Sequence, residues 1–99
     1  MQGIIVRYRY DGDESAWQSV VDQFVSAIAN DQAVKGRFHY TVTAAADGIT
    51  RTHMGRWDSD ETLKTVQSRD YFKAFTDATQ GLAGDSLVSA RMRVAASTD

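Results

Sequence analysis

The sequence predicts an α+β fold in which the elements follow in the order β-α-β-β-α-β. Four short segments have the composition of strands, two longer segments space their apolar residues as helices do, and Asp47-Gly48 separates the second and third strand segments. Two right-handed crossovers around one hairpin give a four-stranded antiparallel sheet with both helices on one face, the ferredoxin-like arrangement. Residues 1–99 are expected to form one such domain, because a chain of this length supports one small core.

The first half of the chain provides one strand and one helix. Residues 3–10, GIIVRYRY, alternate with period two and are rich in β-branched and aromatic types, as strands are. Asp11-Gly12-Asp13 is typical of a turn, and either Asp13 or Ser15 can cap the helix that follows. The apolar residues of that helix form one stripe about five turns long. They are Trp17, Val20, Val21, Phe24, Val25, Ile28 and Ala29.

A hairpin comes next. Residues 37–44 and 49–57 are predicted strands, and Asp47-Gly48 between them favours a two-residue type I′ turn. In that register the facing pairs on one side of the sheet are Phe38 with Trp57, Tyr40 with Gly55, and Val42 with His53. A three-residue loop would instead place Met54 beside Tyr40. We favour the two-residue loop because type I′ turns prefer Asp-Gly so strongly.

The remaining elements are a second helix and a fourth strand. Asp58 and Glu61 have the spacing of a capping box, although Ser59 can serve as the cap instead. The helix that follows is expected to kink near residues 68–70, and residues 86–95 form the last strand. Trp57, at the end of the third strand, is expected to pack between the sheet and this helix.

Arginines are expected to gather on the sheet face away from the helices. Alternation places Ile5 and Leu87 there, together with Arg7, Arg9, Arg37, Arg56, Arg91 and Arg93. All thirteen acidic residues lie outside the predicted strands. Burying unpaired guanidiniums between two such faces would cost several kcal/mol each. These side chains are therefore expected at a solvated rim or against carboxylates of a partner chain.

Composition excludes several classes of function. The chain has no cysteine, so disulfides, thiolate chemistry and cysteine metal sites are ruled out. Its net charge of −2 does not favour nucleic acid or an anionic membrane surface. No apolar run has the length of a signal segment or a membrane span, so a cytoplasmic location is expected. The two histidines lack a third ligand on the strands, and no metal is expected.

One motif resembles a known family. Trp57-x-Ser59-x-Glu61-x-Leu63, followed after a gap by Phe-x-x-Phe at residues 72–75, is similar to the antibiotic biosynthesis monooxygenase family of the dimeric α/β-barrel superfamily. The resemblance implies a homodimer whose sheets face each other, with a small molecule bound between sheet and helices. Some members oxidise polycyclic phenols with dioxygen and no cofactor, relatives degrade haem, and many have no known activity.

Two positions depart from the family pattern. Many members have a histidine where this chain has Val66, and a glutamate where it has Gly55. Haem ligation or acid–base chemistry that depends on those positions therefore does not carry over. No cofactor is expected.

The candidate site lies on the helix-covered side of the sheet. His53 points there into an apolar, aromatic layer, where burial would lower its pKa and keep it neutral, as a base for a phenolic substrate requires. The alternative is a structural histidine bonded to a carbonyl or a tyrosine hydroxyl. His39 is expected on the opposite side, facing Arg56. The predicted ligand-binding residues are Tyr8, Phe24, Tyr40, His53, Trp57 and Phe72.

Three functions remain open from the sequence. The first is a homodimeric small-molecule-binding protein for a flat aromatic ligand, whose catalytic form would be a cofactor-independent oxygenase with His53 as the catalytic residue. The second is a non-catalytic interaction or regulatory domain on the same scaffold. The third is an RNA-binding module, since such modules share this element order. Their stacking aromatics are exposed, whereas here they are predicted under the helices, and no nucleic-acid partner is expected.

Overall fold

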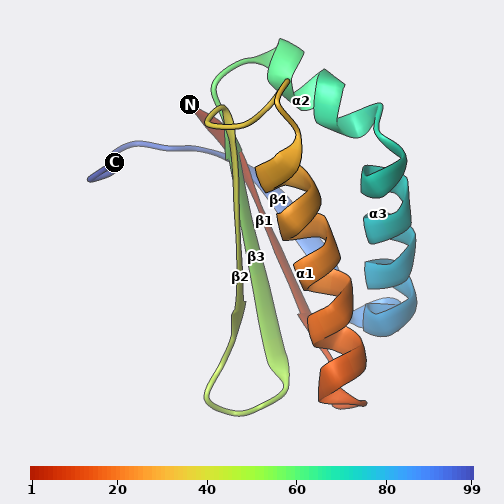
Figure 1. Ribbon diagram of the computed structural model, residues 1–99. Coiled ribbons are helices and arrows are strands. Elements are labelled where there is room, and N and C mark those ends of the chain that lie inside the picture. The colour runs from red at the N-terminus through yellow and green to blue at the C-terminus, as the bar shows by residue number, and fades with distance from the viewer.

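The computed structural model describes all 99 residues and confirms the predicted α+β ferredoxin-like fold. Its elements are β1 (Gln2–Arg9), α1 (Glu14–Asn30), β2 (Phe38–Ala44), β3 (Thr50–Trp57), α2 (Asp60–Gln67), α3 (Asp70–Ala83), the short 3₁₀ helix η1 (Gly84–Ser86) and β4 (Val88–Arg93). The strands form one antiparallel sheet in the order β2-β3-β1-β4. The helices lie on one side of the sheet, and no element covers the other side (Figure 1).

The core lies between the sheet and helices α1 and α3. Asp13 is the N-cap of α1, and its carboxylate accepts from the Ser15 backbone N–H at 2.9 Å. The residues at the centre of the predicted apolar stripe are buried against the core, namely Trp17, Val21, Phe24 and Ile28. Phe24 of α1 stacks on Phe75 of α3, with ring centroids 3.9 Å apart and planes 4° from parallel. Val25, at the edge of the stripe, is exposed.

The predicted kinked helix is two separate helices. The chain leaves helical geometry at Arg69, whose backbone is extended, and side chains at this break contact the C-terminal end of α1. Arg69 Nε donates to Asp31 Oδ2 at 2.9 Å, and the Tyr71 hydroxyl donates to the same oxygen at 2.8 Å. At the start of α2 the cap is Ser59, whose hydroxyl oxygen accepts from a backbone N–H.

The predicted hairpin register is confirmed, but the predicted two-residue type I′ turn is wrong, because the loop between β2 and β3 is longer than two residues. Phe38 pairs with Trp57 in the structure, and the two further predicted pairs follow in step. No residue other than glycine has a positive φ, so Asp47 does not adopt the geometry that a type I′ turn requires. Instead Gly48, at φ 74°, donates its backbone N–H to the Ala45 carbonyl. The Asp47 carboxylate accepts the backbone N–H groups that follow, which keeps the same register.

The expected side of the last strand is also wrong. Arg91 pairs with Ile4 and Arg93 with Gln2, and Gln2 in turn pairs with Trp57, so both arginines lie on the helix-covered face. Because side chains alternate, Val88, Ala90 and Met92 lie on the open face instead. Leu87 packs against the core and not beside Ile5 on the open face. Arg37 precedes β2 and belongs to neither face of the sheet.

No helix has both the length and the apolar character needed to cross a bilayer.

Candidate functional site

His53 lies near the centre of the helix-covered face, between Val6 of β1 and Val42 of β2. It is 1% exposed, and each ring nitrogen has a tyrosine partner. The Tyr8 hydroxyl lies 2.8 Å from Nε2, and the Tyr40 hydroxyl lies 2.9 Å from Nδ1. These are the tyrosine contacts that the structural interpretation of His53 anticipated.

The hydrogen-bonded series continues to α1. Trp17 Nε1 donates to the Tyr8 hydroxyl oxygen at 2.7 Å. Trp17, Tyr8, His53 and Tyr40 therefore form one series, which we call the buried polar chain. It runs from α1 through β1 and β3 to β2, and it ties the first helix to the middle of the sheet.

Burial keeps the buried polar chain uncharged near neutral pH. Desolvation lowers the pKa of His53 to about 4, because the interior disfavours the imidazolium. Desolvation also raises the pKa of Tyr40 and, with opposition from the Trp17 hydrogen bond, that of Tyr8. The predicted direction of the His53 shift is thus confirmed.

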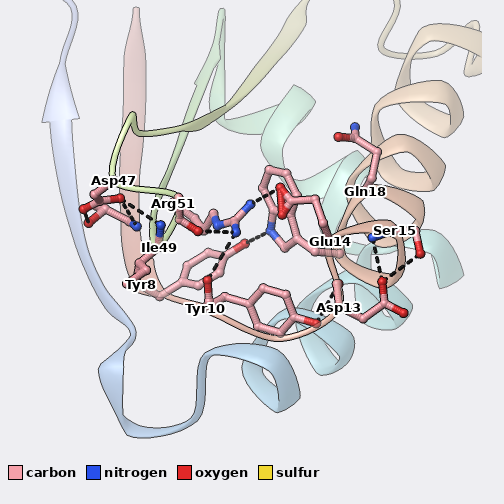
Figure 2. A network of polar contacts seen from close by, with 12 residues as sticks. Tyr8, Tyr10, Asp13, Glu14, Ser15, Gln18, Asp47, Ile49 and Arg51 are labelled. Atoms are coloured by element: carbon pink, nitrogen blue, oxygen red, sulfur yellow. Dashed lines mark hydrogen bonds and ion pairs between the residues drawn. The ribbon is translucent and has the colours of Figure 1, made fainter.

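Arg51 stands behind this chain and was not anticipated as part of the site. It is 1% exposed, and its guanidinium reaches Glu14 Oε1 at 2.8 Å and the carbonyl oxygens of Tyr10 and Gly48 at 3.2 and 2.9 Å. Figure 2 shows these contacts converging on Arg51. Residues two apart on a strand share a face, so Arg51 lies on the same covered face as His53, and this alternation could have identified Arg51 from the sequence.

Two cavities adjoin between the sheet and α3. The first, of about 240 Å³, is lined by Tyr40 and His53 together with other apolar and polar side chains, the polar ones being Thr76, Thr79, Gln80 and Ser89. The second, of about 130 Å³, is lined by aromatic residues and has Arg91 among its walls. The residues common to both are Ile4, Val6, Tyr40, Phe75 and Thr76. We call the pair of cavities the sheet–α3 cleft.

Most residues predicted to contact a ligand line this cleft. They are Phe24, Tyr40, His53, Trp57 and Phe72. Tyr8 lines neither cavity, because it lies behind His53 as the partner of Nε2. A larger, more open hollow of about 950 Å³ lies along the outer side of α1, and eight of its nine lining residues are polar or charged.

Gly55 allows Tyr40 to lie close against the sheet. A Cβ at Gly55 would stand 3.0 and 3.1 Å from two carbons of the Tyr40 ring, tighter than ordinary contact. The space above Gly55 is therefore filled by this ring. The placement brings the Tyr40 hydroxyl to His53 at the wall of the cleft.

Trp57 and Arg91 form the other end of the cleft. The Trp57 ring stacks on Phe38 at a centroid distance of 5.8 Å, and the Arg91 guanidinium lies 5.0 Å from a ring centroid of Trp57. Arg91 forms no ion pair, so it offers an unneutralised positive charge at this end. Trp57 Nε1 and Thr79 Oγ1 are buried without hydrogen-bond partners, and both residues line the cleft.

No group of three or more His, Asp or Glu side chains is placed to hold a metal ion. His39 faces Arg56 on the open side of the sheet, as predicted.

The fold and the cleft together define an α+β protein of the ferredoxin-like class with a small apolar site between sheet and helices. No protein-family model and no curated protein matches the sequence. Solved structures do match. Rv0793 from Mycobacterium tuberculosis superposes with a TM-score of 0.78 at 14% identity, covering 99% of this chain and 98% of that one.

Two further structures match equally well. One is a mutant form of SnoaB, a cofactor-independent oxygenase from Streptomyces nogalater, with a TM-score of 0.78 at 12% identity over 98% of this chain and 95% of that one. The other is a proposed antibiotic biosynthesis monooxygenase from Nitrosomonas europaea, with a TM-score of 0.78 at 8% identity over 97% and 100%. The resemblance to antibiotic biosynthesis monooxygenase-like proteins is thus confirmed at the level of the fold.

Proposed function

We propose that this protein binds a flat aromatic small molecule in the sheet–α3 cleft. The observation that supports this most is the lining of the cleft, which is mainly apolar and aromatic and carries several polar side chains, among them the hydrogen-bonded pair Tyr40 and His53. Small-molecule sites are typically of this kind, with a few placed polar groups that orient the ligand. A cavity of about 150 Å³ can hold benzene, so the two adjoining cavities suit a ligand of two fused rings.

Binding is a better-supported role than catalysis by His53. A phenol has a pKa of about 10, and the pKa of His53 is about 4. Moving a proton from one to the other would be uphill by roughly 8 kcal/mol at 1.36 kcal/mol per pKa unit. Both ring nitrogens of His53 are also occupied by tyrosine hydroxyls. We therefore assign His53 to positioning Tyr40.

A cofactor-independent oxygenase remains the second candidate. Its support is the likeness in fold to SnoaB, which is described as such an enzyme. In this alternative the same cleft would hold a phenolic substrate and dioxygen, and His53 would act as the base. The RNA-binding alternative has less support, because the sheet aromatics Tyr8, Phe38, Tyr40 and Trp57 are all on the helix-covered face.

We further propose that two copies associate through their open sheet faces. On this face Ile5 lies between Met54 and Ala90, and Val88 and Met92 extend the apolar surface along β4. Val88 is 64% exposed and Met54 is 44% exposed. Contiguous exposed apolar surface of this kind marks interaction sites. A self-complementary sheet face suits a two-fold dimer.

The arginines of the open face fit such a dimer at its rim. Arg56 pairs with Asp99 near the end of its own chain, and Arg7 Nε lies 3.5 Å from Thr52 Oγ1. With Arg91 and Arg93 on the other face, fewer guanidiniums need solvent or partners than the sequence indicated. Their stems can cover apolar surface while the charged groups reach water. A cytoplasmic location stays a prediction.

Binding of 1-naphthol, measured by calorimetry together with oxygen uptake, tests the proposed function. We expect saturable binding without oxygen uptake. Thr76→Phe, which fills a position lining both cavities, should abolish binding. Asp77→Phe places the same ring one position along α3, outside the cleft, and should leave binding unchanged. Oxygen uptake that is lost in His53→Ala would favour the oxygenase instead, and binding that survives Thr76→Phe would contradict the cleft.

A further inference from the structure

We infer that the Tyr40 hydroxyl donates a hydrogen bond into the sheet–α3 cleft, and that the ligand therefore presents an acceptor oxygen there, such as the carbonyl of an aromatic ketone. The inference rests on the proposed function, because it requires a ligand in the cleft. It adds the chemical group by which that ligand is recognised.

The direction of the buried polar chain is set at its start. An indole N–H can only donate, so the Tyr8 oxygen accepts from Trp17 at 2.7 Å. The Tyr8 hydroxyl has one other partner, His53 Nε2, at 2.8 Å. A neutral imidazole has one donor and one acceptor nitrogen, so two arrangements of protons are possible.

In the first arrangement Tyr8 donates to Nε2 and the proton of His53 sits on Nδ1. Nδ1–H then donates to the Tyr40 oxygen at 2.9 Å. Every proton of the chain has an acceptor except the hydroxyl proton of Tyr40, and Tyr40 is only half-buried, at the wall of the cleft. A ligand or water in the cleft can accept this proton.

In the second arrangement Nε2–H donates to Tyr8 and Tyr40 donates to Nδ1. The Tyr8 hydroxyl proton is then left without an acceptor, because the residue is 1% exposed and its only hydrogen-bond partners are Trp17 and His53. A buried donor without an acceptor is strongly disfavoured. The first arrangement is therefore the stable one, and it makes Tyr40 the donor at the cleft.

Two features keep Tyr40 in this role. Burial raises its pKa, so the hydroxyl keeps its proton near neutral pH. Packing also fixes its ring, which lies against Gly55 on one side and meets Phe24 and Phe75 edge-on, at centroid distances of 4.9 and 5.7 Å. A donor held this rigidly discriminates between ligands by the presence of an acceptor at one place.

The test compares 1-indanone with indane, which differ by one carbonyl oxygen. For the wild-type protein, we expect calorimetry to show about three- to tenfold tighter binding of 1-indanone, the range for one net hydrogen bond. Tyr40→Phe should remove that difference while still binding indane. Tyr71→Phe is the matched control, since its hydroxyl bonds Asp31 and the residue lines neither cavity of the cleft, and it should keep the difference. Equal affinities in the wild-type protein would overturn the inference.

A second measurement decides the proton arrangement without any ligand or variant. Proton–nitrogen correlation NMR of the free protein at pH 7 should show His53 as the Nδ1–H tautomer, and the Nε2–H tautomer would overturn the donor assignment. If neither indanone nor indane binds, the proposed function fails for two-ring ligands. The tautomer would still show whether Tyr40 is the donor, so the two failures are distinguishable.

Discussion

The guanidinium carbon of Arg51 lies 4.2 Å from a ring centroid of Trp17, which holds the indole whose N–H begins the buried polar chain. The same guanidinium pairs with Glu14 in the first turn of α1. Arg51 therefore couples the β3 end of the hairpin to the start of α1. It contributes packing, a cation–π contact and hydrogen bonds together.

Replacing Arg51 should destabilise the fold substantially. We expect Arg51→Ala to lower the free energy of unfolding by more than about 2 kcal/mol, because it removes a buried side chain and leaves the Tyr10 and Gly48 carbonyls without their donor. Urea unfolding measures this. Arg37→Ala, at an exposed position before β2, should cost less than about 0.5 kcal/mol. A loss of unfolding free energy for Arg51→Ala as small as that for Arg37→Ala would contradict a structural role of Arg51.

Trp57 is expected to anchor the other end of the sheet. Trp57→Ala removes a ring that is 1% exposed and stacked on Phe38, and should cost about 3–5 kcal/mol in denaturant unfolding. A loss below about 1 kcal/mol would place the ring in contact with solvent and contradict this packing. Met92→Ala, on the open face of β4, is a control that should cost much less in the monomer.

Stability should fall as the solution is acidified through the titration range of His53. Unfolded histidine has a pKa of about 6.5, whereas the folded pKa is about 4, so between these values the unfolded state binds a proton that the folded state does not. Neutral His53 therefore contributes about 3 kcal/mol to the free energy of unfolding above pH 6.5, and this contribution is lost as the pH falls toward 4. Urea unfolding at pH 7.5 and 4.5 measures it. His53→Gln should lose much less stability over that interval, and an equal loss would assign the effect to other groups.

The open sheet face should mediate dimerisation. We expect light scattering at tens of micromolar to give the mass of a dimer, and Met54→Asp to give a monomer, because a carboxylate at the centre of that face would be buried without a partner. Val25→Asp changes an exposed apolar residue on α1 and should leave the dimer intact. A monomeric wild-type protein would contradict the proposed association.

The hairpin and the covered face of β3 were predictable from sequence for a physical reason. Pairing of β2 with β3 is local, and burial of Phe38, Tyr40, His53 and Trp57 together allows only one register, since a slip by one residue would expose them all. The register was therefore predicted correctly although the predicted turn was wrong. The complete break between α2 and α3 was harder to predict from sequence, because it depends on the contact of Arg69 with Asp31, which is distant in the chain.

The last strand shows where alternation alone is insufficient. A period-two pattern gives two faces but does not say which one meets the helices, and the usual guide is that apolar residues face the covered side. In β4 the apolar residues Val88, Ala90 and Met92 face the open side. The prediction therefore placed Arg91 on the wrong face of the sheet and did not identify it as a residue that lines the cleft. An apolar open face of this kind is consistent with the proposed association of two copies through their sheets.

A crystal structure of the protein grown in excess 1-indanone tests ligand binding in the sheet–α3 cleft most directly. We expect the bicyclic ring inside the sheet–α3 cleft, between Trp57 and Phe75, with its carbonyl oxygen within hydrogen-bond distance of the Tyr40 hydroxyl. An empty cleft, or the compound bound only on the outer side of α1, would contradict binding in this cleft.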